Sequence, residues 1–90
     1  MTRDDIRDRL SEVFSPQFVE VVDESDQHRG HGGTPHTHNT HFNVTIVSTA
    51  FHGASLVQRH RMVYDALQSA FSSTLHALRI TAKTPDEWGP

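Results

Sequence analysis

Residues 41–48 read HFNVTIVS, and this stretch decides the fold. Apolar and mostly polar side chains alternate along it, with Phe42, Val44 and Ile46 on one side and Asn43, Thr45 and Val47 on the other. Alternation with a period of two predicts a β-strand that buries one face. A single strand cannot bury that face alone, so the neighbouring segments must supply further strands and covering helices.

The segments upstream of this strand predict one helix and one more strand. Thr2 can cap a helix over 2–14, and Pro16 ends it. Between them, apolar residues recur at helical spacing: Ile6, Leu10, Val13 and Phe14. The sequence FVEVVDES then predicts a strand over 17–23. Phe18 and Val22 share one face of that strand, and Val19 and Val21 share the other.

The segments downstream complete the order of elements. Ser55 caps a predicted helix with the sequence LVQRHRMVYDALQSAF, and SST at 72–74 ends it. LHALRITA predicts a third strand over 75–82, and TPDEWGP is expected to fold back onto the domain. An antiparallel hairpin followed by a crossover to the last strand predicts an α+β fold, with a small three-stranded mixed sheet and helices packed on one face.

Residues 24–40 are predicted to form a long, flexible loop, because they contain Gly and Pro but no apolar residue. Five of the eight histidines lie in or next to it: His28, His31, His36, His38 and His41. Neutral imidazole is the commonest protein ligand for transition metals, so the loop is a candidate metal site. The alternative is a polar loop that is merely rich in histidine. Spacing alone favours that alternative, because no motif such as HExxH is present.

Two further groups of residues could carry a function. His76 lies at the start of the last predicted strand, in phase with Leu78 and Ile80, where it could serve as a fixed metal ligand or simply bond a backbone carbonyl. Arg59, His60 and Arg61 form a basic helical turn that could contact phosphate groups. The favoured alternative for this turn is a solvated helix start, or an ion pair with the acidic DES at 23–25.

Length and composition limit the classes of function. Ninety residues predict a single domain over 1–90. The absence of cysteine excludes disulfides, a catalytic thiol and thiolate metal ligands from this chain. A net charge of −3 disfavours non-specific binding to nucleic acid. The sequence has no apolar run that could span a membrane, no signal peptide and no catalytic motif. We therefore expect a cytoplasmic protein that is not an enzyme.

Several motifs, taken together, resemble the BolA family. They are VVDES, THFNVTIVS, FHGASLVQRHRMVY, LHALRITAKTP and the final EW, and the similarity runs from about Ile6 to Trp88. The resemblance implies a fold like a class II KH domain, with the order α-β-β-α-α-β. This order agrees with the predicted elements if one short helical turn is added around 49–57.

The resemblance also implies a role. BolA proteins pair with monothiol glutaredoxins, and the heterodimer holds a bridged two-iron two-sulfur cluster used in iron–sulfur assembly and iron sensing. The glutaredoxin and glutathione supply sulfur ligands. The BolA partner supplies the histidine of the HAL motif, here His76, and a loop residue, here His31 or His28. His41 is the third choice for this second ligand. The inserted sequence PHTHNT adds His36 and His38, which many members of the family lack. The free protein is expected to be a monomer without a cluster.

The same family includes DNA-binding transcriptional regulators, so DNA binding through Arg59, His60 and Arg61 is the alternative function. KH domains grip nucleic acid through a GXXG loop. Here FHGAS stands in that place, so the KH mode of binding is disfavoured.

Overall fold

The computed structural model describes residues 2–24, 41–70 and 77–89. In chain order, their elements are α1 (Arg3–Phe14), β1 (Phe18–Asp23), β2 (His41–Val47), the 3-10 turn η3 (Thr49–Phe51), α2 (Leu56–Ala70), β3 (Ala77–Lys83) and α3 (Pro85–Trp88). The predicted loop over 24–40 lies outside the described residues except at Glu24, as do the predicted ligands His28, His31 and His76 together with His36 and His38.

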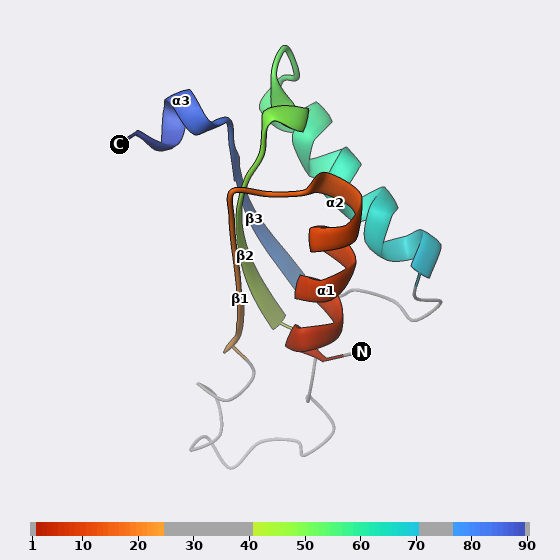
Figure 1. Cartoon of the computed structure of the whole chain (residues 1–90). Helices are drawn as coiled ribbons and strands as arrows, with labels where there is room; N and C mark the ends of the chain where they lie inside the picture. Colours follow the sequence, from red (N-terminus) through yellow and green to blue (C-terminus); the bar gives the residue numbers. More distant parts are fainter. Residues whose placement is uncertain (1, 25–40, 71–76, 90) are drawn as a thin grey trace.

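The three strands form one mixed sheet in the order β1-β2-β3. β2 pairs antiparallel with β1, placing Phe18 opposite Val47, and parallel with β3, placing His41 opposite Ala77. The parallel pair needs a crossover, which η3 and α2 supply (Figure 1). The predicted α+β class and the order α-β-β-α-α-β are confirmed, including the short helical turn after β2.

The core lies between the sheet and the helices α1 and α2. In β2, Phe42, Val44 and Ile46 are buried as the alternation predicts. They pack with buried residues of the two helices and of the neighbouring strands: Ile6, Leu10, Phe14, Val21, Phe51, Val63, Ala66, Leu67 and Ala82. Both helices therefore cover the same face of the sheet (Figure 1).

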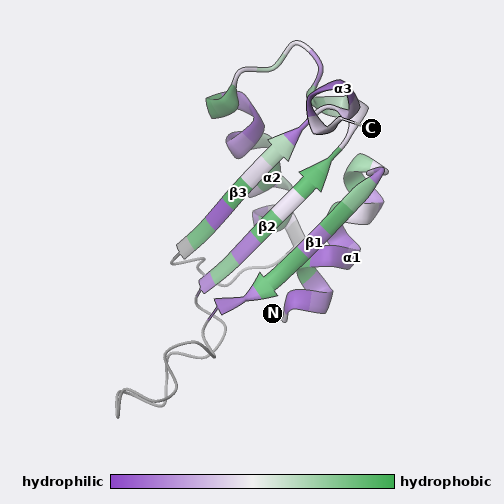
Figure 2. Cartoon of the chain, turned by 90° about the vertical axis from the view of Figure 1, so that its left-hand side faces the viewer, coloured by the Kyte–Doolittle hydropathy of each residue, from purple (hydrophilic) through white to green (hydrophobic). Residues whose placement is uncertain are grey.

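The opposite face of the sheet carries the alternate residues, and we call it the outer face. It consists of Phe18, Glu20 and Val22 of β1, Asn43, Thr45 and Val47 of β2, and Arg79, Thr81 and Lys83 of β3. Figure 2 shows it toward the viewer, with α1 and α2 behind. Trp88 of α3 stacks on Phe18 with ring centroids 5.2 Å apart, so α3 covers one end of the outer face. The prediction that the helices pack on one face of the sheet is thus correct for α1 and α2. The short helix α3 packs on the other face.

Local sequence explains where the helices begin and end. Thr2 forms a capping box with Asp5, so the predicted helix over 2–14 begins at Arg3. Ser15 ends α1 in the left-handed conformation, with φ of 45°. Thr84 forms a second capping box with Glu87 and is followed by Pro85, which favours the first turn of α3. Within the described ranges, no helix combines the length and the apolar composition needed to cross a bilayer.

Candidate functional site

The first candidate site lies where β2 and β3 begin. Parallel pairing places the backbone of His41 beside that of Ala77 (Figure 1). In the sequence, His41 ends the histidine-rich segment and Ala77 follows His76. The sheet therefore brings together two points of the chain that are far apart in sequence and are each directly joined to a predicted ligand segment.

The described surroundings of this site are polar. His41 is half-buried at the end of the sheet. Next to it on the outer face, Asn43 Nδ2 donates a hydrogen bond to Glu24 Oε2 at 3.3 Å. Arg79 lies across from Asn43 in the register of β3, and it is exposed. Among residues 2–24, 41–70 and 77–89, no three side chains of His, Asp or Glu are grouped closely enough to hold a metal ion.

The second candidate site, the basic turn of α2, is built mainly around Arg59. Arg59 is 7% exposed, although its side chain is charged. Its Nε donates to the carbonyl of Ala54 at 2.9 Å, and its Nη1 donates to the carbonyl of Ala82 at 3.0 Å. The guanidinium also binds both carboxylate oxygens of Glu87, at 2.6 and 3.3 Å. Arg59 thus joins the loop before α2, the strand β3 and the helix α3.

The contact with Arg59 lowers the pKa of Glu87. The hydrogen bond from Arg59, followed by the hydrogen bond from the backbone N–H of Thr84, lowers the pKa of Glu87 to about 2. The predicted alternative for Arg59 was an ion pair with the acidic DES at 23–25, and the ion-pair partner is instead Glu87. The capping pattern of Thr84 and Glu87 predicts a helix start, but it does not indicate which arginine the carboxylate will meet.

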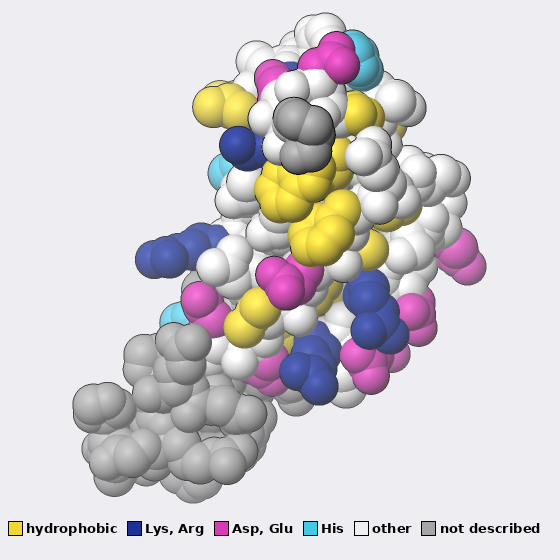
Figure 3. Space-filling model, turned by 60° about the vertical axis from the view of Figure 1, so that its left-hand side comes forward, with side chains coloured by type: hydrophobic (Ala, Val, Ile, Leu, Met, Phe, Trp, Pro, Cys, Tyr) yellow, Lys and Arg dark blue, Asp and Glu magenta, His cyan; other side chains and the backbone are white. Residues whose placement is uncertain are grey.

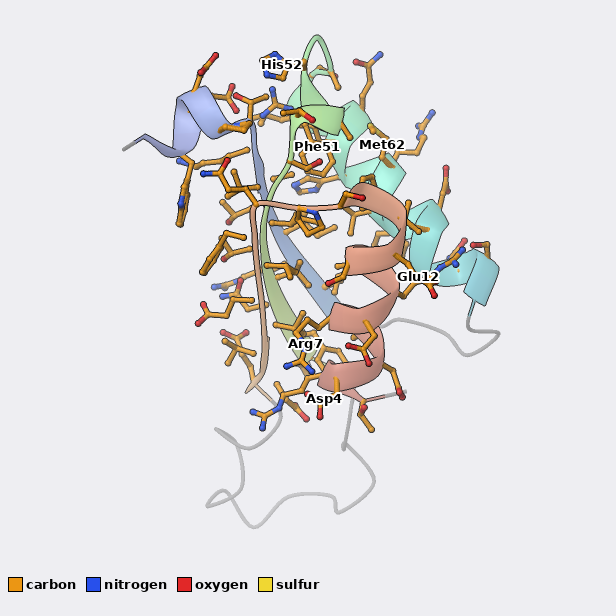
Figure 4. The ribbon with its side chains drawn as sticks, viewed as in Figure 1. Asp4, Arg7, Glu12, Phe51, His52 and Met62 are labelled. Carbon is orange, nitrogen blue, oxygen red and sulfur yellow. The ribbon has the colours of Figure 1, made fainter. Side chains whose placement is uncertain are left out.

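The other two residues of the basic turn differ from each other. His60 Nε2 lies 3.0 Å from the carbonyl oxygen of Ile80 on β3. Arg61 is exposed and lines a hollow of about 490 Å³ with His52 and Gly53. Figure 4 shows His52 on the loop between η3 and α2, at the end of the molecule opposite to the starts of β2 and β3. Of the three predicted phosphate contacts, two are therefore close to backbone carbonyls of this chain.

Comparison with known proteins places the chain in a family. The model of the family described as BolA-like protein matches residues 10–87. The chain belongs to the BolA family. Its sequence is 51% identical over 86 residues to SufE-like protein 1, chloroplastic/mitochondrial, from Arabidopsis thaliana, covering 91% of this chain and 23% of that protein. It is 41% identical over 88 residues to the DNA-binding transcriptional regulator BolA of Escherichia coli, covering 98% of this chain and 80% of that protein.

Solved structures agree with this BolA assignment. The BolA domain of SufE1 from Arabidopsis thaliana superposes with a TM-score of 0.77 at 52% identity, covering 94% of this chain and 93% of that one. The family resemblance and the fold expected from the sequence are thus confirmed. The BolA chain spans between 23% and 58% of the length of three of the curated relatives that it matches.

Proposed function

We propose that this BolA-family chain is an adaptor, not an enzyme, that pairs with a monothiol glutaredoxin. The pair would hold a bridged two-iron two-sulfur cluster as cargo, for iron–sulfur assembly or iron homeostasis. The observation that supports this proposal most directly is the parallel pairing of β2 with β3. It sets His41, at the end of the histidine-rich segment, beside Ala77, which is bonded to His76.

The side chains of this protein can supply the imidazole ligands of such a cluster, but not the thiolate ligands. Imidazole nitrogen ligates iron in clusters where histidine replaces cysteine. The chain has eight histidines and no cysteine, so the thiolate ligands must come from the glutaredoxin and from glutathione. A protein that offers imidazoles alone should not retain the cluster by itself, and this is why we propose a heterodimer.

We assign His76 as the ligand held by the sheet, because it is covalently joined to a residue of β3. The second ligand is proposed among His31, His28 and His41, in that order of preference. His31→Ala should therefore weaken the cluster more than His36→Ala or His38→Ala. An unchanged cluster in all three variants would mean that these histidines belong only to a polar loop.

The decisive experiment mixes the chain with a monothiol glutaredoxin, iron, sulfide and glutathione, and records visible absorption and circular dichroism. His76→Ala should abolish the spectrum of the bridged cluster and leave the far-ultraviolet spectrum unchanged. His52→Ala is the matched control, because it removes an exposed imidazole from the opposite end of the molecule. An unchanged cluster spectrum with His76→Ala would show that the proposed site is wrong.

DNA binding is the second candidate function, and the name of the Escherichia coli relative favours it. The guanidinium of Arg59 already bonds Glu87 and two backbone carbonyls, so the exposed Arg61 is better placed to contact DNA phosphates. Specific binding to a DNA site that weakens with rising salt and is lost with Arg61→Gln would favour DNA binding over the adaptor function. The cytoplasmic location stays a prediction, since the names of two plant relatives place them in organelles.

A further inference from the structure

The outer face of the sheet carries partly exposed apolar side chains at its β1 edge. Phe18, Val22 and Trp88 are 38%, 39% and 42% exposed, and the first two belong to this face while the third stacks on it. Figure 3 shows apolar side chains gathered on this side of the molecule. Burying apolar side chains is the main source of binding free energy, so a face of this kind suits contact with another protein.

Charges on the outer face are separated by strand. Glu20 lies on β1, whereas Arg79 and Lys83 lie on β3, and the central strand contributes only uncharged residues to this face. A partner that matches this face would place acidic side chains against β3 and apolar side chains against β1 and α3. Such an arrangement fixes the orientation of a partner more than it adds to affinity.

The outer face also ends at the first candidate site. Val22, Asn43 and Arg79 form a row across the three strands, and the next row contains His41 and Ala77. A protein seated on this face would therefore reach the starts of β2 and β3, where the cluster is proposed to lie. We propose that the outer face is the docking surface for the partner that supplies the sulfur ligands, an inference that rests on the proposed function.

The small size of the face limits the apolar surface that a partner can bury on it. Strands of six or seven residues extend about 20 Å, and three strands about 4.8 Å apart give a face of roughly 300 Å². Stable protein interfaces bury about 800 Å² on each partner. Docking on this face alone should therefore be weak and short-lived, and a shared cluster should strengthen it.

Trp88 offers a direct readout, because it is the single tryptophan of the chain. With 5-fluorotryptophan incorporated into this chain only, its fluorine resonance should shift when monothiol glutaredoxin is added without iron. A shift that depends on the concentration of this chain alone would overturn the assignment, in favour of docking by a second copy.

Matched substitutions test the face itself. Val22→Asp should weaken the iron-free complex at least tenfold, as measured by titration calorimetry. Val13→Asp should leave it unchanged, since Val13 is 44% exposed on α1, away from this face. In the charge arm of the test, Arg79→Glu should weaken the complex more than Arg61→Glu, because Arg61 is an exposed arginine of α2, which lies behind the sheet. Far-ultraviolet circular dichroism of each variant checks that it is folded.

The outcomes separate this inference from the function on which it rests. If the wild-type chain forms the cluster complex while Val22→Asp and Arg79→Glu bind as tightly as their controls, docking on the outer face is wrong and the adaptor function stands. If the wild-type chain neither binds the glutaredoxin nor forms the cluster, both proposals fail.

Discussion

At the residue scale, the contact between Arg59 and Glu87 makes a prediction about pH. Glu87 has a pKa of about 2 in the folded protein and 4.5 as an ordinary carboxyl group. A lowered pKa stabilises the fold fully above pH 4.5, and this contribution is lost as the pH falls toward 2. Glu87→Gln should therefore lower the melting temperature at pH 7, and the difference from the wild type should shrink between pH 4.5 and 2. Thermal melts followed by circular dichroism at several pH values measure it.

The control for this prediction is Glu12→Gln. Glu12 contacts Arg9 at 3.5 Å, but its side chain is largely exposed (Figure 4), and exposed ion pairs contribute little to stability. Its melting temperature should stay close to that of the wild type at every pH. Equal losses in both variants would mean that Glu87 acts only through general surface charge.

At the scale of elements, the end of α1 stores a small amount of backbone strain. Ser15 adopts φ of 45°, a conformation that costs an L-residue about 1–2 kcal/mol and costs glycine little. Glycine loses about 0.5–1 kcal/mol more backbone entropy on folding, so Ser15→Gly should gain about 0.5 kcal/mol net. For a domain of this size, the melting temperature should rise by about 2–4 °C. Ser11→Gly within α1 should lower it, because glycine is the poorer helix former there.

The elements themselves follow largely from the sequence. The alternation in HFNVTIVS predicted β2 and the burial of Phe42, Val44 and Ile46. It did not predict that Val47, on the outer face, is also buried. The expected crossover predicted the parallel partner. Bounds differ by a few residues, as with the strand expected over 75–82 and described as Ala77–Lys83. The contact of Arg59 with Glu87 and the place of α3 on the outer face were not predictable. Both depend on how distant segments meet, and no local pattern in TPDEWGP selects a partner.

At the scale of the whole molecule, the eight histidines make the net charge depend strongly on pH near neutrality. The net charge of −3 applies with neutral imidazoles, and protonating all eight makes the chain positive. Imidazole must be neutral to bind a metal, and its ordinary pKa is about 6.5. Acidification below about pH 6 should therefore release the cluster from the proposed complex, as followed by visible absorption. The fold should survive, because the contribution of Glu87 is lost only below pH 4.5. A cluster spectrum that persists at pH 5 would contradict ligation by histidine.

The parallel pairing of β2 with β3 has a consequence for how the protein is made. A ribosome releases the segment that contains His41 well before it releases Ala77, and the two cannot meet until η3 and α2 have crossed over between them. Contacts between residues far apart in sequence form late in folding, because the entropy cost of closing the intervening chain comes before the stabilisation from the contact. An incomplete chain thus lacks the paired strand ends. If the cluster binds there, a half-synthesised protein would be unable to share it with a partner.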